Sequence, residues 1–236
     1  METAVHPPPH GVDDLLGVSG LEAQQIVHSR SHGAQSATVP TALCGIAAAQ
    51  AAYTVPMTHG HRIQGSVILR ELLPEDAEPL AAAYIRNRSH LAPWEPARDD
   101  FYFTAAGQAE DVEAKIADCE AGRSLPLILE DGELIIGRFN ITDIVRGPFL
   151  SGHLGYWVDQ AYTGRGIATA ATRQVLSMAA NDGLHRLQAS VLVNNQASQT
   201  VLRTAGFQKI GLAEKYLKIA GQWQDHLLFQ RLLDRD

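Results

Sequence analysis

The segment GYWVDQAYTGRGIAT, residues 155–169, decides the fold of this chain. Residues 156–158 are aromatic or β-branched, as β-strands favour. Gly164 and Gly166 bracket a turn, and from Ile167 onward the apolar residues recur at helical spacing. A glycine turn that leads into a helix presents free backbone N–H groups and the positive end of the helix dipole. This arrangement suits a phosphate or a pyrophosphate.

The composition is that of a globular protein. The chain has 236 residues, of which 45% are hydrophobic and 19% are charged, enough for one main domain and an extension. The formal net charge of −7 argues against nucleic-acid or anionic-membrane binding. Cys44 and Cys119 give neither a disulfide framework nor a zinc motif, and no signal peptide is recognisable. We therefore expect a reducing, cytoplasmic setting.

Two regions are predicted. Residues 1–62 form an N-terminal extension that contains six of the ten histidines, a triple-proline run and two possible short helices. Residues 63–236 form the main domain, and Met57 is a hypothetical functional start. His28 and His32 are spaced like a metal-binding pair on one helical turn, but no third ligand is recognisable, so no metal is expected.

The predicted elements alternate in a way that defines the fold class. From residue 67 their order is β-α-α-β-β-β-α-β-α-β-β, with the last two strands at residues 207–211 and 225–233. This order predicts an α+β fold with a mixed, mostly antiparallel sheet flanked by helices, and not a doubly wound sheet. Residues 86–96 carry two prolines and Trp94. They form either a loop that lines a substrate cleft or a surface linker with Trp94 in the core.

Three local motifs accompany this order. They are TGRGIA at residues 163–168, Asn195-x-x-Ser198 followed by Gly206-Phe207, and GQWQDH at residues 221–226. Together with the element order they resemble the GNAT superfamily of N-acetyltransferases. The branch they resemble most is the ribosomal-protein N-terminal acetyltransferases of the RimJ/RimL type. The resemblance covers residues 63–236 and implies the GNAT fold, in which two central strands splay apart.

The resemblance implies acetyl-CoA as co-substrate and no metal. Backbone N–H groups of the glycine turn would hold the pyrophosphate, since glycines let the backbone approach the phosphates; Thr163 departs from the Gln or Arg of the family signature. Backbone groups of residues 156–158 would bind the cofactor and polarise the thioester carbonyl. Asn195 would bond the pantetheine and Ser198 would protonate the leaving thiolate, although both are also good helix caps. The expected cofactor-binding residues are Tyr156, Trp157, Val158, Thr163, Gly164, Arg165, Gly166, Ile167, Ala168, Thr169, Asn195 and Ser198.

The acceptor side of the site is less determined. When an amine attacks the thioester directly in a ternary complex, a general base or a water chain must take its proton. The glutamate that serves as base in the branch corresponds to Leu217 here. The predicted catalytic residues are Ser198, Glu214 and Asp225, with His226, His153 and Glu95 as further candidates for the base. The predicted substrate-binding residues are Trp94, Glu95, Trp223 and His226, although the third motif is also typical of a tight hairpin turn with Trp223 on the surface.

The predicted function is transfer of an acetyl group to a primary amine, with the N-terminal amine of a ribosomal protein that starts with alanine or serine as the leading acceptor. One alternative is a small amine such as an antibiotic or a polyamine, which a broad apolar cleft around Trp94 and Trp223 would favour. A second is a non-catalytic acyl-CoA-binding regulatory module, suggested by the missing glutamate. The turn lacks the dinucleotide-binding spacing, which argues against a dehydrogenase. We expect a monomer or homodimer without nucleic-acid or membrane partners.

Overall fold

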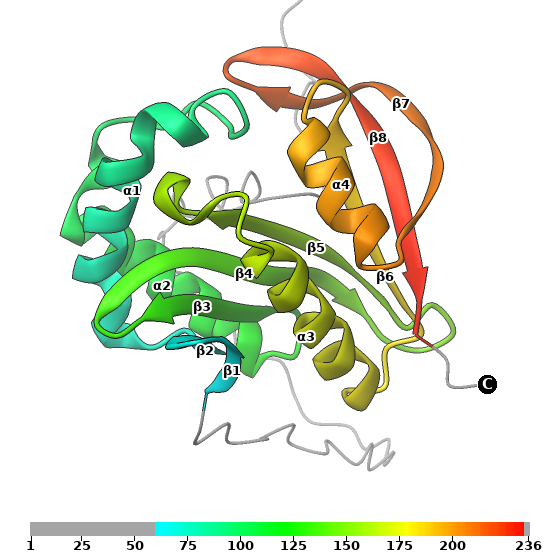
Figure 1. The fold of residues 1–236 in the computed structure, drawn as a ribbon, viewed down its shortest axis with the longest axis horizontal. Helices are drawn as coiled ribbons and strands as arrows, with labels where there is room; N and C mark the ends of the chain where they lie inside the picture. The colour runs from blue at the N-terminus through cyan, green and yellow to red at the C-terminus, as the bar shows by residue number, and fades with distance from the viewer. Residues whose placement is uncertain (1–59, 234–236) are drawn as a thin grey trace, which may run out of the picture.

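One mixed sheet of eight strands runs through residues 60–233, the part of the chain that the computed structural model describes (Figure 1). The strand order is β1-β2-β3-β4-β5-β6-β8-β7, and only the pair β5–β6 is parallel. The predicted α+β class is therefore confirmed. The strands are β1 (His61–Gln64), β2 (Val67–Glu71), β3 (Leu125–Asp131), β4 (Leu134–Val145), β5 (Ser151–Val158), β6 (Arg186–Leu192), β7 (Gln208–Ile219) and β8 (Gln222–Leu232). The helices are η1 (Pro74–Asp76), α1 (Ala77–Leu91), η2 (Phe101–Phe103), α2 (Ala105–Glu120), η3 (Gln160–Tyr162), α3 (Ile167–Asn181) and α4 (Gln196–Thr204).

Helices cover both faces of this sheet. Figure 1 shows α3 and α4 on the near face, where Val175 and Leu202 join the larger core cluster with Phe139 of β4. On the other face, α1 and α2 pack on β3 and β4 through a second core cluster. Because successive strand residues point to opposite faces, the two clusters use alternate positions of the same strands.

The start of the described part differs from the prediction. β1 was not predicted; it pairs with β2 and begins at His61, so it straddles the predicted boundary between residues 62 and 63. Residues 1–59 of the predicted extension, including Met57 and the His28/His32 pair, lie outside the described residues.

Helix α1 runs further than predicted. It continues to Leu91, so the first half of the segment expected to be a loop, residues 86–96, is helical. Asn87 is buried there and donates to the carbonyl of Ala83 and to the carboxylate of Asp159. The long-range bond to Asp159 holds a segment whose sequence alone favoured a break.

Strand β7 is also longer than predicted, because a bulge interrupts it without ending it. The register to β8 shifts between Ala213 and Leu217, and Lys215 adopts a left-handed backbone with φ of 47°. The carboxylate of Asp225 on β8 accepts a hydrogen bond from the Lys215 N–H at 2.8 Å. After the bulge, β7 resumes as far as Ile219, and the hairpin reaches the loop that follows α1 (Figure 1).

Candidate active site

The glycine turn between β5 and α3 forms an open cradle of backbone groups. Gly164 and Gly166 have φ values of 73° and 78°, in the left-handed region that glycine tolerates best. A Cβ atom added to either glycine meets no atom within 4 Å. Gly166 is the N-cap of α3 and provides no side-chain cap, so the first N–H groups of this 15-residue helix are left for an anion. The turn therefore fits the pyrophosphate of acetyl-CoA.

Thr163, the departure from the family signature, does not obstruct this cradle. Its hydroxyl donates to the carbonyl of Gln160 at 2.9 Å, which turns the side chain back into the preceding helical turn η3. The backbone after Thr163 stays exposed. A threonine is thus compatible with a turn that binds through main-chain groups.

Helix α1 anchors the start of the turn through a buried carboxylate. Asp159 is 3% exposed and accepts hydrogen bonds from Asn87, from Arg86 and from the N–H of Ala161. Asn87 in turn accepts from the N–H of Gln160 at 3.0 Å. Burial raises the pKa of Asp159, but the hydrogen bonds from Asn87 and Arg86 outweigh burial and hold that pKa below its usual value. Asp159 is therefore an ionised tether between α1 and the glycine turn at residues 163–166, which we call the cofactor turn.

The opposite flank of the turn is held by Tyr162. Its hydroxyl donates to Asp131 at the end of β3, at 2.9 Å. The guanidinium of Arg165 lies over the Tyr162 ring, 4.9 Å from the centroid. Arg165 does not line the cavity described next, whereas Tyr162 does.

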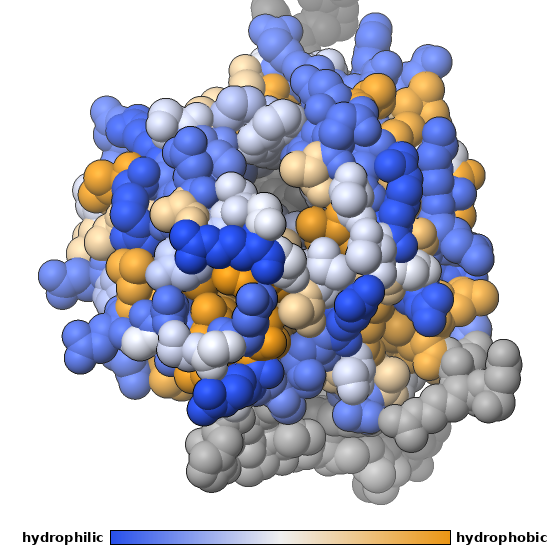
Figure 2. Space-filling model, viewed as in Figure 1, coloured by the Kyte–Doolittle hydropathy of each residue, from blue (hydrophilic) through white to orange (hydrophobic). Residues whose placement is uncertain are grey.

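The parallel strands β5 and β6 separate beside this turn. They pair only at Ser151, Gly152 and His153 of β5, and no pairing follows from Leu154 to Val158. The space between them is part of a cavity of about 550 Å³. Its lining comes from the turn, α3 and α4 on one face of the sheet, and from α1 and the loop after it on the other. The cavity therefore passes through the sheet, and in Figure 2 the surface is hollowed between the two halves of the molecule.

Tyr156 and Ser198 meet inside this cavity. The hydroxyl of Tyr156 lies 2.9 Å from Oγ of Ser198, and either atom can be the donor. The Tyr156 ring stacks on Phe139 with centroids 5.1 Å apart, which fixes its position between β5 and α4. Burial raises the pKa of the Tyr156 hydroxyl well above its usual range, and the bond to Ser198 offsets this only in part. The pair thus stays protonated at neutral pH and can supply a proton.

Asn195 has a structural role in placing Ser198. It is the N-cap of α4, and its side-chain oxygen accepts from the N–H of Ser198 at 3.0 Å. The capping interpretation of Asn195 is thus what the structure shows, and Asn195 still lines the cavity. The cap holds Ser198 at the start of α4, next to Tyr156.

Most of the predicted cofactor-binding and substrate-binding residues come together at the cavity. Four residues of the predicted site and one further candidate for the base do not line it: Arg165, Glu214, Trp223 and Asp225, together with His153. Glu214 is exposed on the β7 bulge, Asp225 is bonded to the Lys215 backbone, and Trp223 is 57% exposed beside the hairpin turn. The predicted residues that line the cavity are Trp94, Glu95, Tyr156, Trp157, Val158, Thr163, Gly164, Gly166, Ile167, Ala168, Thr169, Asn195, Ser198 and His226.

Several lining residues were not predicted. Asn140 of β4 and Ser190 of β6 are buried polar residues that reach the cavity from strands on either side of β5. Ser190 interrupts the apolar strand sequence between Ala189 and Val191, a signal that the sequence contains. Nothing local distinguishes Asn140, since its role depends on which strand lies beside β5.

Leu217, at the position of the branch glutamate, is buried in a small apolar cluster. It is 1% exposed and packs with Leu192 and Ile219, against which Trp94 and Tyr216 lie. Beside this cluster the N–H of Ala220 donates to the carbonyl of Glu95 at 3.0 Å. The loop after α1 and the β7–β8 hairpin therefore join over the acceptor side of the cavity.

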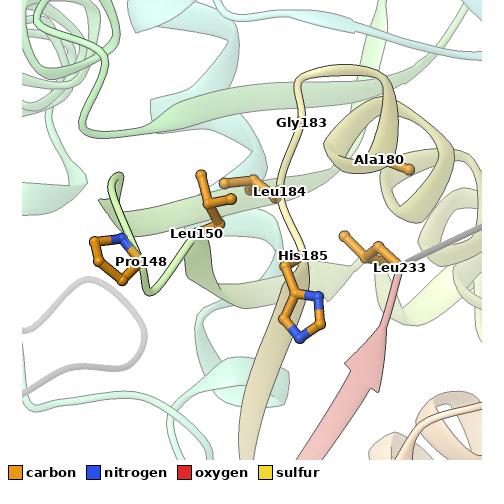
Figure 3. A pocket seen from close by; sticks show the side chains of 7 residues that line it. All are labelled: Pro148, Leu150, Ala180, Gly183, Leu184, His185 and Leu233. Atoms are coloured by element: carbon orange, nitrogen blue, oxygen red, sulfur yellow. The ribbon is translucent and has the colours of Figure 1, made fainter.

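A second hollow lies at the other end of α3. It has a volume of about 470 Å³, and its lining joins the loop before β5, the end of α3 and the end of β8 (Figure 3). His185 is the one titratable side chain that lines it.

Within residues 60–233 no three or more histidine, cysteine or acidic side chains gather as metal ligands, and no helix there is long and apolar enough to cross a membrane. The cavity through the sheet is the candidate active site.

The chain belongs to the acetyltransferase (GNAT) domain family, whose sequence pattern matches residues 66–208. This confirms the predicted family, and with it an N-acetyltransferase that uses acetyl-CoA. One curated relative is the [ribosomal protein uS5]-alanine N-acetyltransferase of Escherichia coli, 34% identical over 165 residues, or 69% of this chain and 85% of the relative.

Two solved structures extend the similarity to three dimensions. The ribosomal-protein-S5-alanine acetyltransferase of Vibrio fischeri superposes with a TM-score of 0.71 at 34% identity, over 75% of this chain and 97% of that one. Mycobacterium smegmatis RimJ, solved in complex with CoA-disulfide, gives a TM-score of 0.68 at 33% identity, over 70% and 81% of the two chains. The resemblance to the RimJ/RimL branch is thereby confirmed.

Proposed function

We propose that this enzyme acetylates the N-terminal α-amine of a protein that begins with a small residue such as alanine or serine. The observation that carries the proposal is the cavity through the sheet, which joins the cofactor turn on the α3 side to Trp94 and His226 on the α1 side. Relatives that act on the alanine of a ribosomal protein support the choice of acceptor.

The positions of two tryptophans favour a protein terminus over a small molecule as the acceptor. The predicted small-molecule alternative needed an apolar cleft between Trp94 and Trp223. Trp94 packs on the Leu217 cluster, whereas Trp223 is largely exposed outside the cavity. The Glu95–Ala220 hydrogen bond joins the loop after α1 to the β7–β8 hairpin beside Trp94. The two tryptophans therefore do not form the broad apolar cleft that would favour a small molecule, and the acceptor of the relatives, a protein N-terminus, is preferred.

Residues of this chain account for each step on the acetyl-CoA side of the cavity. Backbone N–H groups of the turn and of the first turn of α3 bind the pyrophosphate. Acetyl-CoA, once bound, supplies the activated acetyl group. Between Leu154 and Val158 β5 pairs with β4 but not with β6, so its backbone groups on the β6 side are available to bond the pantetheine and the thioester carbonyl. The Tyr156–Ser198 pair gives a proton to the departing sulfur.

Cytoplasmic location stays a prediction, and so does the monomeric or homodimeric state. The regulatory-module alternative is not favoured, because the Tyr156–Ser198 pair and the cofactor turn are both assembled.

The test is intact-mass analysis of peptides after incubation with enzyme and acetyl-CoA. We expect an Ala-starting peptide with an internal lysine to gain one acetyl group at its α-amine. The same peptide with a blocked α-amine should gain none, although its lysine remains. Acetylation of the lysine in both peptides, or faster acetylation of polyamines and aminoglycosides in a parallel panel, would contradict the proposed acceptor.

A further inference from the structure

His226 occupies the acceptor side of the cavity, opposite the cofactor turn. Its strand neighbour Leu227 belongs to the core cluster under α3, so His226 points to the other face of the sheet. Across the strands it pairs with Leu192, which packs with Trp94 on that same face. Tyr156 packs toward the α3 side, where it meets Ser198. His226 and the Tyr156–Ser198 pair thus line the same cavity from opposite faces of the sheet.

The imidazole of His226 is held in one orientation. The side chain is 2% exposed, and Nδ1 lies 3.0 Å from the carbonyl of Gln224. A carbonyl only accepts, so Nδ1 carries the proton and Nε2 keeps its lone pair. The Tyr216 ring packs at 5.7 Å between centroids. No hydrogen bond to Nε2 is present within residues 60–233.

We propose that Nε2 of His226 is the base that takes the proton from the attacking amine, in the place of the glutamate that Leu217 replaces. This inference rests on the proposed function. It gives His226 the role of general base in the reaction, in addition to a place in the substrate-binding side of the cavity.

The electrostatics of His226 agree with this role. Burial lowers the pKa of His226 below its usual value, and neither the bond to Gln224 nor the charge of Asp225 compensates fully. The ring is therefore neutral at pH 7, as a base must be. The other titratable groups around it are Tyr216 on β7, and His90 and Glu95 on the α1 side of the cavity.

The proposed step is balanced. The lone pair of the neutral amine forms the N–C bond, the carbonyl π pair moves onto oxygen, and the nitrogen becomes positively charged and acidic. His226 then takes the proton at Nε2, which a neutral imidazole can do although a free α-amine has a pKa near 8. When the carbonyl re-forms, the C–S bond pair leaves with sulfur, which takes a proton through Ser198 and Tyr156. The imidazolium loses its proton to solvent and the hydroxyl pair regains one.

The experiment is the pH dependence of kcat/KM for the Ala-starting peptide. In the unmodified enzyme both the amine and His226 must be neutral, so log kcat/KM should fall with slope two below the pKa of His226. His226→Asn keeps a donor for the Gln224 carbonyl and removes the base. We expect kcat/KM near pH 7.5 to fall by about 10² to 10⁴, a slope of one at low pH, and unchanged CoA affinity.

The matched control is His185→Asn, which removes a histidine at the second hollow and should retain slope two and the full rate. If His226→Asn loses CoA affinity, His226→Gln is measured with added imidazole, and a rate that rises with imidazole concentration supports the assignment. Slope two in a folded His226 variant, or kcat/KM within threefold of the unmodified enzyme, would overturn it. If the enzyme acetylates only small amines, the proposed acceptor fails, but the same slopes measured with that amine still decide the role of His226.

Discussion

Replacing Gly166 by glutamate tests how the cofactor turn works. The left-handed backbone at this position, with φ of 78°, costs a residue with a Cβ about 1–2 kcal/mol of stability. No atom lies within 4 Å of the added Cβ, so the fold has room for the side chain. The new carboxylate, however, would lie beside the backbone N–H groups that are proposed to bind the pyrophosphate. We therefore expect a folded protein with slightly lower thermal stability and very weak CoA binding.

The size of the effect follows from comparison with Gly166→Gln, which has the same shape and the same backbone strain. A carboxylate roughly 6 Å from one phosphate charge is repelled by ~0.7 kcal/mol in a water-like medium and ~3 kcal/mol at an effective dielectric constant of 20. CoA affinity should thus be about threefold to about hundredfold lower for Glu than for Gln. The ratio should shrink at high salt, because ions screen exposed charges.

The assay is calorimetric titration of CoA, with thermal unfolding recorded alongside. Gly183→Glu is the matched control: it lies at the other end of α3 with φ of 79° and the same open surroundings. It should lose similar stability and keep full CoA affinity. The reasoning is refuted if Gly166→Glu binds CoA as tightly as the unmodified protein, or if Gly183→Glu weakens CoA binding as much.

Variants at three further places, the Tyr156–Ser198 pair, Asp159 and Leu217, test the rest of the site. Tyr156→Phe and Ser198→Ala should each lower single-turnover acetyl transfer by about tenfold or more, with CoA affinity kept; because the two hydroxyls act as one unit, the double variant should lose less than the product of the two losses, and multiplying losses would contradict a shared role. Asp159→Asn should lower the melting temperature at pH 7. Because the pKa of Asp159 in the folded protein lies below the unfolded value of about 3.9, the stabilisation by its carboxylate is complete above that pH and is lost as the pH falls below it. The melting temperatures of the variant and the unmodified protein should therefore converge at low pH. A difference in melting temperature that stays constant with pH would count against the tether. Leu217→Glu should destabilise the fold by about 2 kcal/mol or more in chemical denaturation, because it buries a carboxylate among apolar side chains, and a raised kcat would show that the branch base can be restored there.

That the turn and Ser198 come together on the α3 side of the cavity could be predicted from the sequence, because the signals there are local. The Gly164–Gly166 turn, the strand before it and the helix after it lie within one short segment. Ser198 lies on the next helix, at a fixed distance from its cap Asn195. Residues that bind through the main chain are also insensitive to side-chain identity, so the departure at Thr163 does not weaken the prediction.

The acceptor half could not be predicted in the same way, because it is assembled by contacts between distant segments. Glu214 and Asp225 were predicted as catalytic from their position along the chain, but neither lines the cavity: Glu214 is exposed on the β7 bulge, and Asp225 accepts a hydrogen bond from the Lys215 N–H of that bulge. That bulge depends on the register between β7 and β8. Asn140 reaches the cavity only because β4 lies beside β5. No local sequence pattern predicts that these two strands are neighbours.

A crystal structure with CoA bound is the most direct measurement of how donor and acceptor are separated by the sheet. We expect pyrophosphate oxygens to accept hydrogen bonds from the N–H groups of residues 164–169. The sulfur should lie in the gap between β5 and β6, within hydrogen-bonding reach of Ser198 or Tyr156, with the space toward His226 left for the amine. CoA bound in the hollow around Leu150 and His185, or a sulfur on the α1 side of the sheet next to His226, would contradict this arrangement.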